Sequence, residues 1–138
     1  MGYLDFAGSG TIHLTGAIGA LVTTVMLKPR TNRFNPKYSD EFQPSNITYI
    51  VLSTLILYFC WMFFNAGSSL AISGDNIYVM GTAGMNTMLS GASGGLTVFI
   101  IHYLLNKKSN NRFSLVMICN GNLAGLLANT GFRFFIHL

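Results

Sequence analysis

A short column of aromatic and hydroxyl side chains occurs in the stretch LYFCWMFFNAGSSL. Trp61, Phe64 and Ser68 occupy positions i, i+3 and i+7. On an α-helix these three side chains fall within roughly 60° of one another and spread over about 10 Å of the axis. Aromatic faces attract a partly dehydrated cation by roughly 0.5–2 kcal/mol, and a hydroxyl oxygen accepts a hydrogen bond. The column therefore suits a small cation, although an interfacial belt of aromatic residues would give the same pattern.

Two further polar groups belong to the apolar stretch DFAGSGTIHLTGAIGALVTTVML. His13 lies inside this run, and Asp5 lies at its start. If the whole stretch is helical, the two groups are about 12 Å apart along the axis and roughly 80° apart around it, so we expect no direct contact between them. A histidine within a membrane span faces a cavity or a partner rather than lipid. Two explanations for His13 are therefore open: it lines a transport path, or it forms a hydrogen bond to another helix.

Asp5 is followed closely by Gly8, Ser9 and Gly10. A carboxylate at this place can accept backbone N–H bonds at a helix start, and its charge complements the positive end of the helix dipole. Capping and a direct ligand role are both open for Asp5.

The remaining histidines and the cysteines predict no additional site. His102 and His137 lie close to the ends of apolar runs, where an interfacial position is expected, and Cys60 and Cys119 lie inside apolar stretches, where buried thiols are expected. The sequence has no metal-ligand spacing, phosphate-binding loop or nucleophile motif. We therefore expect no cofactor, no metal ion and no enzymatic activity.

The elements that position these groups follow from the distribution of charge. Charged residues make up 9% of the 138 residues and apolar residues 51%, whereas about 25% of an ordinary soluble domain is charged. Four charge-free intervals each provide the roughly 20 residues that cross a bilayer as a helix. We predict an all-α, polytopic transmembrane fold in one domain, residues 1–138, with about four helices over residues 6–27, 47–72, 77–105 and 113–132.

The basic residues predict the orientation of these spans. The first connection contains four Lys and Arg residues, the second none and the third three. Basic residues beside spans mark the cytoplasmic side. We therefore expect connections 28–46 and 106–112 to be cytoplasmic and the N-terminus to lie outside. Since the basic residues are explained in this way, the net charge of +4 does not predict a nucleic-acid partner.

Small residues recur where membrane helices would touch. The third predicted span repeats them every four residues, at Ala83, Thr87, Gly91 and Gly95, and the fourth contains Gly121 and Gly125 as a GxxxG pair. In lipid, helices associate by close backbone approach along such grooves. We expect these helices to be surrounded by other helices.

Four stretches together resemble the ammonium transporter family (Amt/Mep/Rh) in order and spacing: DFAGSGTIHLTGAIGALV, YFCWMFFNAGSSL, MNTMLSGASGGLTVFI and NGNLAGLLANT. The resemblance implies a fold of about eleven transmembrane helices, built as two inverted five-helix repeats plus a last helix. It also implies trimers with one pore per subunit, in the plasma membrane. This chain resembles only helices five to eight of that fold.

The resemblance implies a role for each candidate residue. Trp61 and Ser68 resemble the external recruitment site for ammonium, and Phe64 resembles one of two stacked phenylalanines that gate the pore. His13 resembles the first of the twin pore histidines. Asp5 resembles the aspartate near the entrance that organises the site. The family is thought to recruit the cation, separate its proton and pass ammonia through an apolar channel.

The chain also departs from the family pattern. The second pore histidine and the other gating phenylalanine would lie on helices outside this chain, and GFRFFIHL replaces the proline and small-residue run that usually follows LLANT. These departures leave two hypotheses. The chain either contributes part of one pore of a longer transporter, or it is a non-conducting assembly or regulatory partner of full-length subunits.

Overall fold

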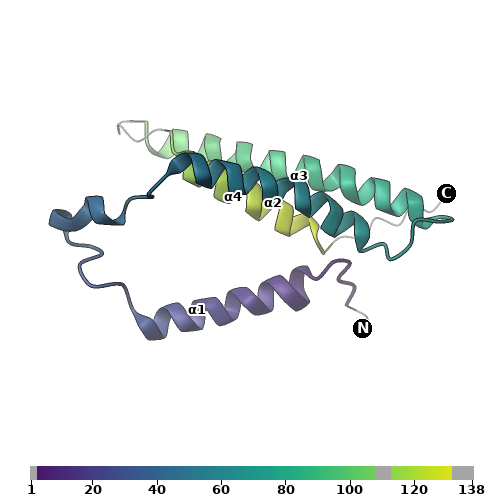
Figure 1. Cartoon of the computed structure of the whole chain (residues 1–138), viewed down its shortest axis with the longest axis horizontal. Helices are drawn as coiled ribbons and strands as arrows, with labels where there is room; N and C mark the ends of the chain where they lie inside the picture. The colour runs from purple at the N-terminus through teal and green to yellow at the C-terminus, as the bar shows by residue number, and fades with distance from the viewer. Residues whose placement is uncertain (1–2, 108–112, 132–138) are drawn as a thin grey trace.

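The computed structural model describes residues 3–107 and 113–131 and consists of helices joined by loops (Figure 1). Within these residues no β-strand occurs. The elements in chain order are a π-helical segment Ser9–Leu14, α1 Thr15–Leu27, a 3₁₀ helix Pro36–Phe42, α2 Ile47–Gly67, α3 Asn76–Leu105 and α4 Leu115–Asn129. The predicted all-α fold is confirmed.

In the described part of the chain, three helical stretches are long and apolar enough to cross a membrane: Ser9–Leu27, Ile47–Gly67 and Asn76–Leu105. Their 19, 21 and 30 residues correspond to helices of roughly 28 Å or more, against a hydrocarbon core of about 30 Å. α4 is apolar but has only 15 residues. The fourth predicted span, residues 113–132, extends beyond the described residues.

The first helix begins later than predicted. Residues 5–8 are not helical, and Gly8 has φ +92°, a conformation that glycine adopts without steric cost. A Cβ atom on Gly8 would lie 2.6 Å from Cδ1 of Ile12. The prediction of a helix from residue 6 is therefore wrong, and so is the helical geometry that it assumed between Asp5 and His13.

α2 ends at Gly67 rather than at the predicted residue 72. The N–H groups of Ser68, Ser69 and Leu70 each donate to the carbonyl oxygen three residues earlier, which tightens the chain into turns. Leu70 then adopts φ +61°. This value lies in the left-handed region, so the right-handed helix cannot continue through it. Ser68 consequently lies at the C-cap of α2 and not within the helix.

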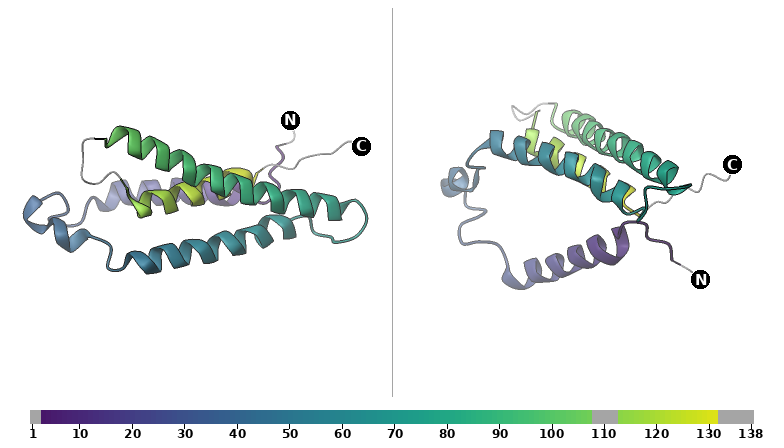
Figure 2. Two further views of the ribbon diagram at one scale, coloured as in Figure 1. Left: turned by 90° about the horizontal axis from the view of Figure 1, so that it is seen from above. Right: turned by 45° about the vertical axis from the view of Figure 1, so that its right-hand side comes forward.

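α3 and α4 pack side by side with their backbones in close approach (Figure 2). A Cβ atom on Gly94 would lie 2.4 Å from the carbonyl oxygen of Gly121, and one on Gly125 would lie 2.2 Å from the carbonyl oxygen of Ser90. The Ser90 hydroxyl donates to the Gly125 carbonyl oxygen at 2.6 Å. The predicted Gly121 and Gly125 thus face α3, but the α3 residues closest to them, Ser90 and Gly94, lie beside the predicted stripe. Of that stripe, Gly91 and Gly95 also face α4, against Leu126 and Asn122.

α2 packs against α3 through Tyr58. The Tyr58 hydroxyl donates to the carbonyl oxygen of Met88. Its ring lies over Gly91, where a Cβ atom would come within 2.5 Å of Cε2. A tyrosine inside a membrane helix bundle needs such a partner because lipid tails accept no hydrogen bond.

α1 lies apart from the bundle formed by α2, α3 and α4 (Figures 1 and 2). Among the described residues it contacts the π-helical segment before it, and that segment in turn contacts α4. No residue of α1 is buried. Lipid or further helices can cover this apolar surface equally well, because helix association in a bilayer has no hydrophobic driving force.

Candidate functional site

His13 meets two aromatic rings of α2 where the N-terminal segment reaches the bundle. Its ring stacks on Trp61 with centroids 5.3 Å apart and an angle of 25° between the planes. Phe64 lies 6.0 Å from His13 and 5.9 Å from Trp61, tilted against both rings. Aromatic pairs at such distances contribute roughly 0.5–1.5 kcal/mol beyond their buried area. The structure thus brings together three of the five predicted site residues.

The π-helical segment that carries His13 is held against the end of α4. The backbone N–H of Ala7 donates to the carbonyl oxygen of Thr130 at 2.8 Å, and the Ser9 hydroxyl donates to the carbonyl oxygen of Leu127 at 3.3 Å. Carbonyl groups at a helix end lack the usual partner within the helix. The Ala7 bond supplies one to Thr130, and the Ser9 bond adds to the one that Leu127 accepts from the Thr130 N–H. π-helical turns are rare and often occur at functional sites, and His13 lies within this one.

Trp61 is fixed to α4 by its indole nitrogen. Nε1–H donates to Oγ1 of Thr130 at 2.9 Å. The Thr130 hydroxyl in turn donates to the carbonyl oxygen of Leu126 at 3.0 Å, and its side chain is fully buried. Thr130 is not among the predicted site residues, because its only signal in the sequence is a hydroxyl at the end of an apolar stretch.

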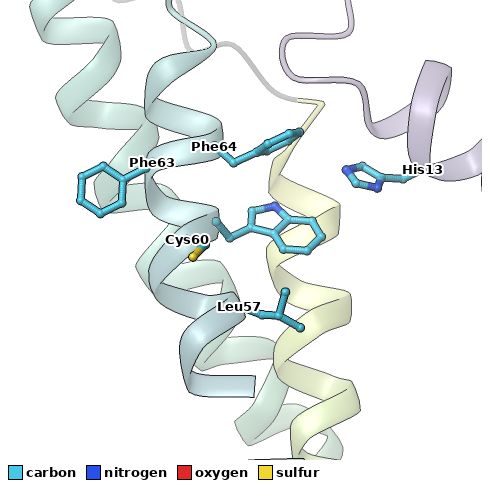
Figure 3. Close-up of a pocket in the computed structure, with 6 residues that line it drawn as sticks. His13, Leu57, Cys60, Phe63 and Phe64 are labelled. Carbon is cyan, nitrogen blue, oxygen red and sulfur yellow. The ribbon is translucent and has the colours of Figure 1, made fainter. Parts of the chain in front are cut away.

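An open pocket of about 480 Å³ borders the His13 ring. Its lining residues are His13, Leu57, Cys60, Trp61, Phe63 and Phe64. Figure 3 shows His13 approaching from the N-terminal segment, while Phe63 points away from it on the other side of α2. The polar groups of the lining are the imidazole, the thiol of Cys60 and the indole N–H of Trp61, which is bonded to Thr130. Cys60 is exposed rather than buried as predicted. Cys60 is exposed because no described helix covers this face of α2.

Nε2 of His13 is buried and has no hydrogen-bond partner among the described residues. A buried polar atom without a partner is costly, so it normally meets a ligand, a water molecule or another residue. An imidazole nitrogen can accept or donate a hydrogen bond and can transfer a proton. The pocket therefore suits a small nitrogen or oxygen compound beside His13, with aromatic faces that also favour a cation.

Ser68 lies one helical turn beyond Phe64, toward the end of α2. Its hydroxyl donates to the carbonyl oxygen of Phe64 at 2.8 Å, and its oxygen lone pairs are left to accept a bond. Ser68 is not among the residues that line the pocket. The predicted column is therefore divided, with Ser68 at the helix end and Trp61 beside His13.

Asp5 organises the start of the π-helical segment. Oδ2 accepts bonds from the N–H groups of Gly10 at 3.1 Å and Thr11 at 2.8 Å, and from the Thr11 hydroxyl at 2.8 Å. The backbone bond from Thr11 is the main cause that lowers the pKa of the Asp5 carboxyl below its usual value. The predicted backbone N–H bonds to Asp5 are confirmed, although they reach across a loop rather than along a helix.

The lowered pKa predicts a loss of local order in acid. Because the folded pKa is below the unfolded one, Asp5 stabilises the segment at neutral pH, and this contribution disappears as the pH falls below about 4. We expect Asp5→Ala to speed hydrogen exchange of the Gly10 and Thr11 amides several-fold at pH 7. Asp75→Ala, at the loop between α2 and α3, is the matched control and should leave both amides unchanged. Unchanged exchange in Asp5→Ala would contradict the role.

A polar cluster joins α2, α3 and α4 behind the pocket. Oγ1 of Thr87 accepts hydrogen bonds from Nδ2 of Asn65 at 2.9 Å and from Nδ2 of Asn129 at 3.2 Å. It donates to the carbonyl oxygen of Ala83 at 2.6 Å. Asn65 and Thr87 are buried. Asn65 follows Phe64 and Asn129 precedes Thr130, so this cluster fixes the helices that carry the pocket's rings.

Two predicted positions add nothing to the site. His102 is half-buried near the end of α3, and its interfacial position stays a prediction. His137 lies outside the described residues. Within residues 3–107 and 113–131, no group of three or more His, Cys, Asp or Glu side chains could hold a metal ion.

Spanning helices, a glycine groove and an imidazole at an apolar pocket together define part of a polytopic α-helical membrane protein. A profile of the Ammonium Transporter Family matches residues 1–138, and the chain therefore belongs to this family. No solved structure matches the chain.

Individual relatives are similar over most of this chain. It is 37% identical over 130 residues to the ammonium transporter Amt2 of Archaeoglobus fulgidus and 35% identical over 130 residues to the ammonium transporter MEP2 of Saccharomyces cerevisiae. Both alignments cover 94% of this chain but only 26% and 25% of the relatives. The chain thus spans about a quarter of these relatives, whose names are those of transporters rather than enzymes.

Proposed function

We propose that the protein containing this segment transports ammonium across a membrane, with His13 on the conduction path. The observation that carries the proposal is the buried, unpartnered Nε2 of His13 at an apolar pocket whose walls include Trp61 and Phe64. The names of the similar proteins supply the substrate. A homotrimer in the plasma membrane, implied by the family resemblance, belongs to the same proposal.

The pocket's chemistry favours conduction of the neutral molecule. Moving an intact charge into a low-dielectric interior costs tens of kcal/mol by Born estimates, so proteins neutralise the group instead. In this proposal Trp61 and Ser68 recruit the cation near the outer end of α2, and Phe64 gates the path. The cation transfers its proton to water at the outer surface before ammonia enters. Ammonia then hydrogen-bonds to His13. The indole ring of Trp61 stacks on His13 and so also keeps the imidazole in place.

The orientation follows from the charges at the two ends of the bundle. Connection 28–46 lies at the end where α2 begins and α3 finishes, and the N-terminus lies at the opposite end (Figure 1). The first end carries the basic residues of that connection and Lys107. By the rule that basic residues stay inside, we propose a cytoplasmic position for connections 28–46 and 106–112 and an external N-terminus.

Removal of the imidazole tests the transport role. In the full-length transporter that contains this segment, we expect His13→Ala to lower ammonium-dependent flux at least tenfold. A positioned side chain that transfers a proton typically changes a rate by that factor or more. His102→Gln is the matched control and should retain flux. Uptake of labelled methylammonium into proteoliposomes measures both. Full flux in His13→Ala would remove His13 from the path.

A second function, that of a non-conducting partner of full-length subunits, is favoured by the incomplete wall of the pocket. The pocket is open, and α1 leaves its apolar face uncovered among the described residues. The partner role predicts no flux from liposomes that contain the 138-residue chain alone, so flux that disappears in His13→Ala would reject it. Absence of flux is expected from both functions, because part of a pore does not conduct either. The mass of the native product in its own membranes separates them: a band near 15.1 kDa supports the partner role, and a band several times larger supports the whole transporter.

A further inference from the structure

The connection between α1 and α2 is rich in basic side chains and is tied to the membrane at both ends. Lys28, Arg30, Arg33 and Lys37 are all exposed. The preceding helix, α1, and the following helix, α2, both belong to stretches of membrane-spanning length. A segment with spans on both sides stays close to the lipid headgroups. Its basic side chains are therefore held within reach of the lipid headgroups.

Aromatic rings accompany these cations. The guanidinium carbon of Arg33 lies 5.9 Å from the ring centroid of Phe34 and 5.2 Å from that of Phe42. Nζ of Lys37 lies 5.7 Å from the ring centroid of Tyr38. Phe34 is 81% exposed. Aromatic side chains at headgroup level and basic groups beside them are the pattern of an interfacial segment.

The acidic residues of the connection follow its basic residues, and only Lys37 shares an element with them. Asp40 and Glu41 lie in the 3₁₀ helix Pro36–Phe42, after the last basic residue. At the opposite end of the bundle the described charges are Asp5 and Asp75, with no Lys or Arg there. The field of the described residues is therefore positive at one membrane surface only.

We propose that residues 28–38 bind the anionic phospholipid headgroups of the adjacent leaflet. Arg30 and Arg33 can each hold a phosphate through two parallel N–H bonds, while Lys28 and Lys37 act as point charges. Phe34 enters the interface between the headgroups and the acyl chains. Each basic residue near an anionic surface strengthens binding by about five-fold. This interaction depends on neither the substrate nor the pore and can be tested on the 138-residue chain.

Lipid competition tests the proposal directly. The chain in detergent micelles is mixed with equal amounts of phosphatidylglycerol and phosphatidylcholine, and bound lipids are counted by native mass spectrometry. We expect a preference for phosphatidylglycerol that Arg30→Gln/Arg33→Gln lowers roughly twenty-five-fold, from two such factors. The preference should also fall as salt is raised, because exposed charges are screened beyond about 10 Å at 0.1 M salt.

Two controls keep loss of folding from imitating this result. Asp40→Asn/Glu41→Gln removes the negative charges of the same connection and should strengthen the preference, which is the opposite of the loss expected from Arg30→Gln/Arg33→Gln. Asp75→Asn, at the other end of the bundle, should leave it unchanged. Circular dichroism of each variant reports its helix content. Equal retention of the two lipids by the parent chain, or a preference that survives in Arg30→Gln/Arg33→Gln, would overturn the proposal.

Discussion

Replacing Gly125 by alanine is expected to lower the free energy of unfolding of the helix bundle by about 2–3 kcal/mol, the upper part of the range for overpacked interiors. A Cβ atom at this position would lie 2.2 Å from the carbonyl oxygen of Ser90. Because the obstacle is backbone of α3 and not a flexible side chain, α3 and α4 must separate. The hydrogen bond from the Ser90 hydroxyl to the Gly125 carbonyl oxygen would lengthen with them.

Gly84→Ala is the matched control, because no atom lies within 4 Å of a Cβ built there. Both substitutions raise helix propensity by at most about 1 kcal/mol. Only Gly125→Ala adds a steric clash. Unfolding of both variants in increasing dodecyl sulfate, followed by circular dichroism, gives the comparison. Equal stability of Gly125→Ala and Gly84→Ala would contradict the close packing of α3 and α4.

Replacing Thr87 by valine is expected to lower the free energy of unfolding by about 2 kcal/mol. The substitution keeps the side-chain shape but leaves the amide groups of Asn65 and Asn129 without an acceptor. One unpaired buried donor costs about 1–3 kcal/mol, whereas interhelical hydrogen bonds in membranes average only about 0.6 kcal/mol. Because Asn65 and Thr87 are buried and two bonds are lost, we expect a cost near the middle of the first range.

The fluorescence of Trp61 reports the structural consequence of Thr87→Val, because Trp61 is the single tryptophan of the chain. Asn129 is adjacent to Thr130, whose hydroxyl accepts the bond from the Trp61 indole. We expect the emission maximum of the indole to shift to longer wavelength, because the ring is held less firmly. Thr87→Ser retains the hydroxyl and should restore both emission and stability. An unchanged emission spectrum in Thr87→Val would show that the cluster does not position Trp61.

The candidate site was predictable in its residues but not in its arrangement. Helical spacing predicted that Trp61, Phe64 and Ser68 share one face of a helix, and α2 places the first two in contact with each other. Spacing could not predict that α2 ends at Gly67, because this depends on the turns that follow and on the positive φ of Leu70. The predicted recruitment role of Trp61 and Ser68 stays a prediction.

His13 and Asp5 illustrate the same limit. Their distance was predicted from a helix that starts too early, because a local apolar pattern does not show that Gly8 turns the chain. The contact between His13 and Trp61 joins residues 48 positions apart in the sequence. No periodicity within either helix contains that information.

The sequence by itself determined the membrane class, the all-α fold and the family, because hydropathy, charge spacing and motifs are local properties of the chain. Only the tertiary structure decided which groups meet: the indole of Trp61 with Thr130, and the amides of Asn65 and Asn129 with Thr87. The physical reason is that a polar group in a bilayer must find its partner on another helix. That choice depends on the rotation and depth of each helix in the packed bundle.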